Sequence, residues 1–592
     1  MTFDQAFLFG LLAALFALLI WGRWRYDLVA FGALVVAVLA GVVPADGAFA
    51  GFGHPAVVII ALVLIVSRGL ANSGAVDLIA SRVVDAGHGL FGHILKMSGI
   101  AAGLSAVMNN VAALALLMPV DLQAAKSAGR SPALTLMPLS FASILGGLVT
   151  LIGTPPNIII AQFREDALGE PFRMFDFTAV GAVCAGAGIA FITLVGWRLI
   201  PAARRERDVP GELFELESYV AELKVTDSSK AVGQKVSDLD GTVREHDALI
   251  LGVVRYGQRM GGNARRVVIE ADDVLVVQGG PEALDRLVAS LGLDYPGAEQ
   301  EDGPLRRQDL ELMEVVVPNG ALIENRSAAG LGLLERHAVA LLGVSRQGQR
   351  FRQRVGDLTI RAGDILLLLG PAERLPAIAQ WLGAFQLAAR GLQVAQPRQA
   401  GLAVLIFASA ILLASLGIVP LAAALAGVVV LMVVVGIVQL RQAYESVEWP
   451  VIVLLASLIP IGHAMEASGG TALIADAILA AASGYGPVVV LTVLLVATMT
   501  LSDVLNNTAT AVIAAPIALD IAGRLAVSPD PFLMAVAVGA SCAFLTPIGH
   551  KNNTLIMGPG GYAFGDYWRM GLPLEILVVA VAVPAILLVW PL

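Results

Sequence analysis

The chain contains 592 residues, of which 57% are hydrophobic and 14% charged, and its mean hydropathy is +0.79. These values exceed those of a soluble globular protein, so we expect much of the chain to lie in a lipid bilayer. The formal net charge of −9 argues against general binding to nucleic acid. Cys184 and Cys542 both fall in apolar segments and indicate neither a disulfide framework nor a metal site.

Uncharged apolar runs occur in both outer parts of the chain, near the length of about 17 to 25 residues that crosses a bilayer. The first residues lack the basic region and the cleavage site of a signal peptide, so we expect the first run to remain as a membrane span. The runs lie at residues 7–21, 28–43, 179–197, 402–419 and 421–440.

The middle of the chain, between about Pro201 and Arg398, is polar and rich in charge. Within it, residues 251–259 reappear as residues 342–350, an offset of 91 (342 − 251). This self-similarity indicates a tandem repeat. Each copy alternates short β-rich runs with turn glycines and ends in a helical pattern. We therefore predict two small α+β domains, at residues 210–295 and 305–390.

The flanking regions, residues 1–202 and 398–592, also resemble each other. Three segments recur in the same order, which predicts that one region is a duplicate of the other. Residues 54–60 match 449–455, residues 105–112 match 502–509, and Thr154-Pro155 matches Thr546-Pro547, at offsets of 395, 397 and 392.

Each half is expected to contain three spans, a hairpin around an Asn-Asn pair, an interrupted span with Thr-Pro, and a last span. Because five full crossings is an odd number, the second half would enter from the opposite side. The sequence thus predicts an α-helical polytopic membrane protein with two inverted-topology repeats, each with five spans and a re-entrant hairpin, and two inserted α+β domains.

Basic residues of the predicted loops fall on one side of the membrane. By the positive-inside rule this side is cytoplasmic, so we expect the inserted domains in the cytosol and both termini outside. These residues are Arg23, Arg25, Lys126, Arg130, Arg204, Arg205, Arg207, Arg441 and Arg569.

Polar and helix-breaking residues interrupt four apolar segments, two in each half. Lipid offers no partner to exposed backbone groups, so such breaks persist where they line a polar cavity. Helix N-termini at a break can bind an anion, and carbonyl and side-chain oxygens can hold Na⁺. Alternatively, these residues only hold helices together, but their repeat-related order favours a site. The segments are residues 109–110, 153–157, 506–508 and 546–549.

These segments resemble the divalent-anion/sodium symporter (DASS) family of the ion-transporter superfamily. That family carries Ser-Asn-Thr at each of two hairpin tips and proline-containing breaks in two later helices. Here the tips are Asn109-Asn110-Val111 and Asn506-Asn507-Thr508, and the breaks are Gly153-Thr154-Pro155 and Leu545-Thr546-Pro547. The resemblance covers about residues 1–200 and 400–592.

The resemblance implies two Na⁺ sites and one substrate site. One Na⁺ site would contain Ser105, Asn109, Asn110 and Gly153, and the other Ser502, Leu505, Asn507 and Leu545, where both leucines act through carbonyls. The substrate would contact Asn109, Asn110, Val111, Thr154, Pro155, Asn506, Asn507, Thr508, Thr546, Pro547 and, if it neutralises the anion, Lys551.

Two departures from the family pattern bear on substrate choice. Asparagine replaces the leading serine of both motifs, and Val111 replaces the first threonine. The Asn-Asn tips resemble the sulfate-type branch, as do residues 546–549 and 558–562. The polar repeat is similar to paired TrkA-C (RCK-C) domains, which implies dimerisation and a possible small-molecule ligand; alternatively it is an assembly domain without a ligand.

Asp503 and Lys551 are the ionisable residues nearest the second predicted site. A charge within a membrane segment is a functional candidate. The two could pair with each other, Lys551 could neutralise substrate, or Lys551 could cap the end of a broken helix whose dipole favours a cation. The histidines near span ends, namely His54, His88, His93 and His463, are expected to be interfacial.

The sequence therefore predicts a multi-pass protein of the inner (plasma) membrane that works as a homodimer. We expect Na⁺-coupled symport, with H⁺ as a possible coupling ion, of a small divalent anion by an elevator-type motion, with sulfate ahead of C4-dicarboxylate. The alternatives are an uncoupled or efflux anion carrier gated by the cytosolic domains, and a non-transporting sensor of sulfur status. No enzymatic motif occurs, and we expect no cofactor, with Na⁺ as the coupling ion.

Overall fold

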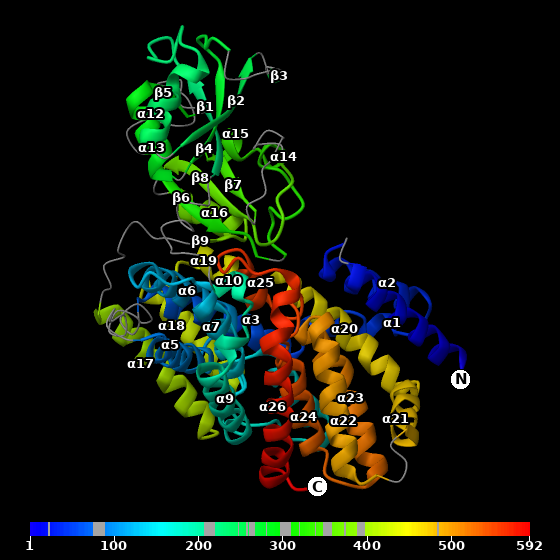
Figure 1. The fold of residues 1–592 in the computed structure, drawn as a ribbon. Coiled ribbons are helices and arrows are strands. Elements are labelled where there is room, and N and C mark those ends of the chain that lie inside the picture. Colours follow the sequence, from blue (N-terminus) through cyan, green and yellow to red (C-terminus); the bar gives the residue numbers. More distant parts are fainter. Residues whose placement is uncertain are drawn as a thin grey trace.

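The computed structural model shows a helical body, built from both outer parts of the chain, and a lobe of strands from its middle (Figure 1). Predicted features that fall outside the described residues include Arg23, His88 and residues 347–350 of the polar repeat. The model describes the chain apart from residues 22–23, 75–88, 206–218, 247, 256–257, 260–266, 280, 296–309, 319, 338, 347–357, 372–373, 387–396 and 482–484.

The first part of the helical body contains eight described helices of more than ten residues. Pro55 and Pro155 begin two of them, where a missing N–H group costs no helical hydrogen bond. The helices are α1 (Phe3–Trp21), α2 (Tyr26–Leu39), α3 (Pro55–Asn72), α5 (Leu90–Ser105), α6 (Asn110–Ser127), α7 (Ala133–Gly147), α8 (Pro155–Leu168) and α9 (Thr178–Leu194). Short turns are η1 (Ala45–Gly47), η2 (Ala50–Gly53), η3 (Gly196–Leu199) and α10 (Ala202–Arg205).

The second part is again a series of helices with short non-helical segments between them. Its elements are α17 (Pro397–Ser415), α18 (Leu421–Val434), α19 (Leu440–Glu445), α20 (Trp449–Ala467), α21 (Gly470–Ala481), α22 (Pro487–Val504), α23 (Asn507–Leu525), α24 (Asp530–Ser541), α25 (Lys551–Met557), η7 (Phe564–Asp566) and α26 (Tyr567–Val589). The sequence predictions of apolar spans fall on α1, α2, α9, α17 and α18.

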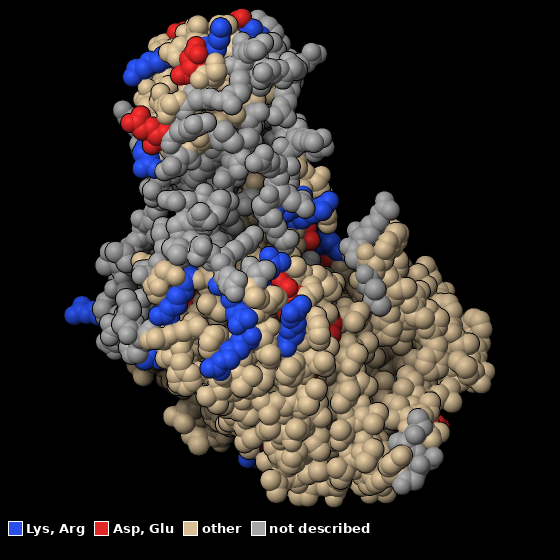
Figure 2. Space-filling view, viewed as in Figure 1, with Lys and Arg blue, Asp and Glu red and all other residues tan. Residues whose placement is uncertain are grey.

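The helical body has the character of a multi-pass membrane protein. In the part of the chain that the structure describes, six helical segments are long and apolar enough to cross a membrane, and shorter apolar helices accompany them. The face seen in Figure 2 is almost uncharged, except where Lys and Arg gather at the end next to the lobe. The six segments are Ala45–Asn72, Arg398–Ser415, Trp449–Ala467, Pro487–Val504, Asn507–Leu525 and Phe564–Val589.

The centre of the body is formed by α7 and α24, whose residues are almost all buried. The two parts of the chain interlock around them, because α23 and α24 pack on α8, and α26 packs on α9. Phe141 of α7 meets Phe544, just after α24, with ring centroids 4.9 Å apart. Residues of one part therefore lie against breaks in the other. The duplication and its inverted topology remain predictions.

Two antiparallel sheets form the lobe. The first has the order β3-β2-β4-β1-β5 and the second β7-β8-β6-β9, so four strands of each follow the same order. Both contain an irregularity at matching positions, between Ile250 and Gly252 and between Leu341 and Gly343. The strands are β1 (Tyr219–Val225), β2 (Leu249–Arg255), β3 (Gln258–Arg259), β4 (Val274–Gly279), β5 (Leu293–Asp294), β6 (Leu310–Val316), β7 (Ala340–Ser345), β8 (Ile365–Pro371) and β9 (Phe385–Gln386).

Short helices flank the sheets: η4 (Val236–Leu239), α12 (Asp240–Glu245) and α13 (Pro281–Leu291) beside the first, and α14 (Ala328–Leu331), α15 (Leu333–His337) and α16 (Leu375–Trp381) beside the second. Strand β1 packs against β7, so the sheets touch each other. In Figure 1 the second sheet lies next to the helical body and the first lies beyond it.

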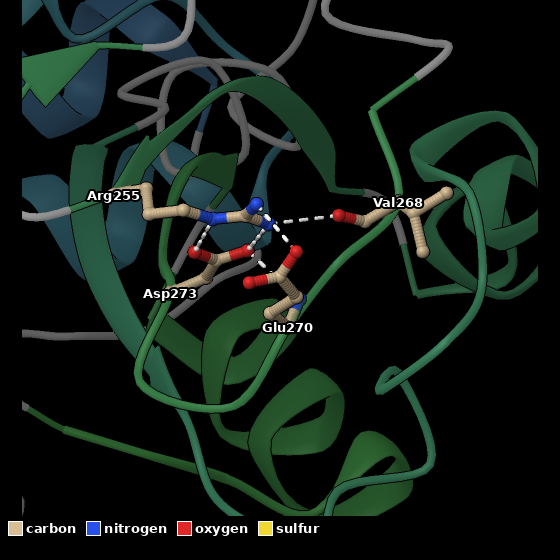
Figure 3. A network of polar contacts seen from close by, with 4 residues as sticks. All are labelled: Arg255, Val268, Glu270 and Asp273. Atoms are coloured by element: carbon tan, nitrogen blue, oxygen red, sulfur yellow. Dashed lines mark hydrogen bonds and ion pairs between the residues drawn. The ribbon is translucent and has the colours of Figure 1, made fainter.

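An ion pair between a buried aspartate and a partly exposed arginine fixes the same turn in each sheet. Figure 3 shows Arg255, which donates to both carboxylate oxygens of Asp273 at 2.7 Å, to Glu270 at 2.6 Å and to the Val268 carbonyl at 2.9 Å. The hydrogen bonds to the Asp273 carboxylate raise the pKa of Arg255 above its usual range. Bidentate pairs of this kind are geometrically specific.

The second sheet repeats this arrangement at the offset of 91 found in the sequence. Arg346 donates to both oxygens of Asp364, at 2.6 and 2.5 Å, and to the Thr359 carbonyl at 2.9 Å. The position of Glu270 is taken by Arg361 (270 + 91). The contacts thus agree with a tandem repeat, while the likeness to TrkA-C domains remains a resemblance.

The described contacts between the second sheet and the helical body include a hydrogen bond and a close backbone approach. Arg68 of α3 donates to Gln380 of α16 at 2.9 Å. The turn at Gly363 lies on the end of α25, where a Cβ added to Gly558 would stand 2.5 Å from the Gly363 carbonyl oxygen. This turn uses a positive φ of 84°, which glycine adopts without strain. The lobe therefore touches α25, the short helix that follows the Thr546-Pro547 segment.

Candidate functional site

The first break separates α5 from α6 at the predicted Asn-Asn tip. Asn109 Oδ1 accepts a hydrogen bond from the Val111 N–H at 2.8 Å, which satisfies a free donor at the start of α6. Ser105 Oγ donates to Asn110 Oδ1 at 2.6 Å, and Ser143 Oγ donates to the Asn110 carbonyl at 2.9 Å. The structure thus places Ser105 in contact with Asn110, next to Asn109, while their role as Na⁺ ligands stays a prediction.

The second break, between α22 and α23, repeats these bonds. Asn506 Oδ1 accepts from the Thr508 N–H at 2.9 Å, and Ser502 Oγ donates to Asn507 Oδ1 at 3.0 Å. The chain is extended at the buried Leu505 between the helices. Both contacts stand 397 residues after those of the first break (507 − 110 and 502 − 105). A serine hydroxyl therefore orients an asparagine amide at each tip.

The breaks before α8 and α25 share a second set of hydrogen bonds. Asn157 Nδ2 donates to the carbonyls of Thr150 at 2.8 Å and Gly147 at 3.4 Å. Asn553 Nδ2 donates to the carbonyls of Thr546 and Ala543, both at 3.1 Å. The three offsets are each 396 (553 − 157, 546 − 150 and 543 − 147). An asparagine amide holds the broken backbone in both halves.

These contacts correct the register that the sequence suggests for the second pair of breaks. Thr150, and not Thr154, matches Thr546: Thr150 donates to the Ala106 carbonyl, and Thr546 donates to the Asp503 carbonyl at 2.6 Å. Thr154 precedes the first residue of α8 as His550 precedes that of α25. The error arose because the shared Thr-Pro dipeptide occupies different places, at the start of a helix in one half and four residues before it in the other.

His550 and residues of α25, from the other half of the chain, contact the first tip. His550 Nε2 lies 3.3 Å from Asn110 Nδ2, and His550 Nδ1 accepts from the Asn552 N–H at 3.1 Å. Asn552 Nδ2 donates to the Asn110 carbonyl at 3.3 Å and to Ser143 Oγ at 3.2 Å. Ser140 Oγ donates to Asn553 Oδ1 at 3.0 Å. A buried polar network thus joins both halves.

Sequence reasoning missed His550, Asn552 and Asn553 as site candidates. The signal was present, because a run of five polar residues, His550 to Thr554, interrupts an otherwise apolar region. All three side chains are buried, and buried polar groups need hydrogen-bond partners.

Lys551 pairs with Glu448, at the start of α20, and not with Asp503. It is the first residue of α25, where the helix dipole disfavours a cation. The reading of Lys551 as a favourable helix cap is therefore wrong, and the Glu448 carboxylate offsets its charge instead. Its contact with substrate remains a prediction.

The other predicted residues line the four breaks. Val111 and Thr508 lie in the first turns of α6 and α23. The remaining positions before α8 and α25 are Gly153, Thr154, Pro155, Leu545, Thr546 and Pro547. Among the described residues no hydrogen bond joins Gly153 to Asn110. Both residues instead lie close to Gly147. A Cβ added to Gly147 would stand 2.4 Å from Asn110 Oδ1, and a Cβ added to Gly153 would stand 2.5 Å from the Gly147 carbonyl oxygen.

The site offers neutral oxygen atoms rather than a cluster of metal-binding side chains. Within the described parts of the chain, no group of three His, Cys, Asp or Glu residues could hold a metal ion. Hydroxyl, amide and carbonyl oxygens at the two tips are ligands that suit a hard monovalent cation. In the first turns of α6 and α23 the N–H groups of Val111 and Thr508 already donate to the capping asparagines, so an anion would bind to the other N–H groups of these turns.

Comparison with known proteins gives the family. A model described as a citrate transporter (CitMHS) matches residues 16–522 and 478–592. The uncharacterized transporter sll0640 of Synechocystis sp. is 31% identical over 92% of this chain and 90% of its own length. A putative sulfur deprivation response regulator of Chlamydomonas reinhardtii is 27% identical over 94% of this chain and 97% of its own length.

Sodium/sulfate cotransporter 1 of Chlamydomonas reinhardtii is 24% identical over 54% of this chain and 38% of its own length. Relatives that are transporters confirm the expectation that the chain is not an enzyme. The match of the family model to both halves, together with the apolar helices and their paired breaks, shows that the chain belongs to the citrate-transporter (CitMHS) family of the ion-transporter superfamily.

Proposed function

We propose that the protein is a Na⁺-coupled symporter of a small divalent anion, with sulfate favoured. The observation that carries the proposal is the pair of tips, each with a serine bonded to an asparagine amide, Ser105 to Asn110 and Ser502 to Asn507. Each tip combines oriented oxygens for a cation with a helix N-terminus for an anion. Cation and anion would then bind at the same breaks, which is the physical basis of coupling.

Na⁺ would bind at two places, and the register of the structure refines the residues involved. The first site would use Ser105, Asn109, Asn110 and Gly153, and the second Ser502, Leu505 and Asn507. At the offset of 396, the counterpart of Gly153 is Gly549. The offset of 392 used in the sequence analysis gives Leu545 instead. A Cβ on Gly549 would stand 2.9 Å from the Ser502 carbonyl oxygen, so this backbone closely approaches the second tip.

Sulfate is favoured over carboxylates by the Asn-Asn tips and by the sodium/sulfate cotransporter among the relatives. Two amide groups and backbone N–H groups can bind an oxyanion without a full positive charge. The citrate-transporter description of the family supports the alternative, a C4-dicarboxylate or another carboxylate. Lys551 would neutralise either anion only after release from Glu448.

The lobe is proposed to lie in the cytoplasm, below the inner membrane. Basic side chains at the end of the body next to the lobe support this orientation (Figure 2). We infer a homodimer in which a substrate-carrying part moves against a dimerising scaffold, with the lobe biasing that motion. A small-molecule ligand of the sheets would act only if it bound the two conformations unequally.

Uptake into proteoliposomes tests the proposal. Radiolabelled sulfate, succinate and citrate would be supplied with an inward Na⁺ gradient, and with choline in place of Na⁺. We expect Na⁺-dependent uptake of sulfate above that of the carboxylates. Flux that ignores both Na⁺ and H⁺ gradients would instead indicate an uncoupled carrier, and binding without uptake would indicate a sensor.

A further inference from the structure

His550 brings a hydrogen-bond donor to the first tip. Its Nδ1 accepts from the Asn552 N–H at 3.1 Å, and an imidazole that accepts at Nδ1 carries its hydrogen on Nε2. This Nε2 stands 3.3 Å from Asn110 Nδ2, which is also a donor. Among the described residues it has no other polar contact. Two N–H groups therefore face each other where the two halves of the chain meet.

The Asn110 amide is held in this orientation by Ser105. The side of an amide that carries the oxygen follows from its hydrogen bonds. Ser105 Oγ lies 2.6 Å from Asn110 Oδ1, a distance within the range of an O–H donor and below that of an N–H donor. Ser105 is fully buried, and among the described residues Oδ1 is the acceptor of its hydroxyl group. The amide oxygen therefore faces Ser105, and the amide nitrogen faces His550.

The second tip lacks this pair of donors among the described residues. Ser502 Oγ lies 2.6 Å from the Ala540 carbonyl and 3.0 Å from Asn507 Oδ1. Its one hydrogen has a closer acceptor than the amide, so Ser502 does not fix the Asn507 amide as Ser105 fixes that of the first tip. The counterpart of His550 is Thr154 (550 − 154 = 396), which has no ring nitrogen.

The two donors of the first tip are buried. Asn110 is 3% exposed and His550 is 8% exposed, and a buried donor without an acceptor is unfavourable. An oxygen atom between Nδ2 and Nε2 would accept from both groups, and neutral N–H groups bind an oxyanion without a full positive charge. The described hydrogen-bond partners of the two side chains include no carboxylate that would repel an anion.

We propose that the N–H groups of His550 Nε2 and Asn110 Nδ2 together bind one oxygen atom of the transported anion. The identity of that anion rests on the proposed sulfate symport, whereas the pair of donors does not. Asn110 then serves two ligands, because its Oδ1 faces Ser105 of the predicted cation site and its Nδ2 faces the anion. His550 belongs to the other half of the chain, so the bound anion bridges the two halves.

Equilibrium binding of radiolabelled sulfate to the purified full-length protein, in saturating NaCl, tests the pair of donors without a gradient. His550→Asn keeps an oxygen that can cap α25, but its shorter side chain brings no donor to the place of Nε2. We expect its dissociation constant for sulfate to rise about tenfold or more, with little change in the midpoint of thermal unfolding. His550→Gln, which restores an N–H group, should recover much of the affinity. His463→Asn, on an exposed face of α20, is the matched control and should bind as the wild type does.

Unchanged anion affinity in His550→Asn would overturn the proposal and leave His550 as a structural contact. If that variant does not fold, ¹⁵N-histidine spectra of the wild type decide: saturating sulfate should shift an imidazole N–H signal, and no shift would overturn the pair of donors. If succinate or citrate binds in place of sulfate, and binding depends on His550, the sulfate assignment fails and the pair stands. His550-dependent binding without Na⁺-dependent uptake would refute the symport alone, and no binding of any of the three anions would overturn both.

Discussion

The two breaks that form the tips share one scaffold but differ in the chemistry behind them. In both, a serine orients an asparagine amide and a second asparagine caps the next helix. The second tip has Asp503 and Glu575 near it. The residues 397 positions earlier, near the first tip, are Ala106 and Thr178 (503 − 106 and 575 − 178). A shared backbone geometry therefore does not imply equivalent ion chemistry.

The hydrogen bonds show how this difference arises. In the first half hydroxyl groups donate to free carbonyls, as Thr178 Oγ1 does to Val149 at 2.8 Å. In the second half carboxyl groups accept from free N–H groups of Phe544 and Leu545. Both arrangements give hydrogen-bond partners to backbone groups of an interrupted helix in an apolar interior. A hydroxyl group stays neutral, whereas a carboxyl group can change its charge.

The tips also differ in what covers them. His550 and Asn552 of the second half contact Asn110, whereas no described residue of α8 makes a hydrogen bond with Asn507. Hydrogen bonds thus join the first tip to the other half of the chain. Among the described residues no such bond reaches Asn507, although α23 packs on α8. The following predictions test this asymmetry, from the largest expected effect to the smallest.

The feature common to both tips should be essential. We expect Asn110→Ala and Asn507→Ala each to abolish Na⁺-dependent sulfate uptake, because each removes an amide that orients ion or substrate. Asn110→Ala also removes the acceptor of the buried Ser105 hydroxyl, whereas Ser502 keeps its bond to the Ala540 carbonyl at 2.6 Å. Uptake in proteoliposomes, at matched protein levels, is the measurement. Asn72→Ala is the control, because Asn72 is the last residue of α3 and lies outside the proposed site. Its hydrogen-bond partner among the described residues is Gln442. Transport by either tip variant would refute the site.

Loss of the contact between His550 and Asn110 should lower uptake less than loss of either tip asparagine. His550→Ala is expected to lower uptake about tenfold, because loss of one partner in a buried network costs about 1 to 3 kcal/mol. His463→Ala, on an exposed face of α20, should leave uptake unchanged. An unaltered rate in His550→Ala would show that the cross-half contact plays no part in transport.

The register between the breaks before α8 and α25 can be tested with single substitutions to alanine. A Cβ on Gly153 or Gly549 would stand 2.5 or 2.9 Å from backbone atoms, and overpacking of this kind costs about 1 to 3 kcal/mol. We expect Gly153→Ala and Gly549→Ala to weaken the Na⁺ dependence of uptake similarly, by several-fold. Leu545→Ala should change it little, since only its carbonyl is used. A larger effect at Leu545 than at Gly549 would favour the offset of 392.

The smallest effect is expected where the lobe meets the second half. Gly558→Ala would place a Cβ 2.5 Å from the Gly363 carbonyl oxygen, so it should separate the lobe from α25 and change the uptake rate about twofold to threefold. Gly565→Ala is the control, because no atom lies within 4 Å of its added Cβ.

Deletion of residues 210–390, bridged by a flexible linker, extends the same test. We expect the membrane part to fold and to transport at an altered rate, measured by the same uptake assay, because none of the predicted site residues lies in the lobe. An unchanged rate would leave the lobe as an assembly domain, and failure to fold would make it a structural scaffold.

The sequence alone determined the membrane character of the chain, the places of both Asn-Asn breaks and the repeat in the lobe. Composition is sufficient for the first, and the constant offsets of 397 and 91 mark the others. These properties are local, because apolar runs, helix caps and turns depend on neighbouring residues. The grouping of Ser105 and Asn110 in one Na⁺ site came instead from the resemblance to the symporter family, and it stays a prediction.

Only the tertiary structure decided which distant groups meet. His550 stands 440 residues from Asn110, and Asn552 donates to Ser143 across 409 positions. A shared dipeptide was too short to fix the register, and the bonds of Asn157 and Asn553 supplied it. Contacts of this kind follow from how α7, α24 and α26 pack, and packing depends on side-chain shapes along the whole interface, which the pattern of apolar residues does not specify.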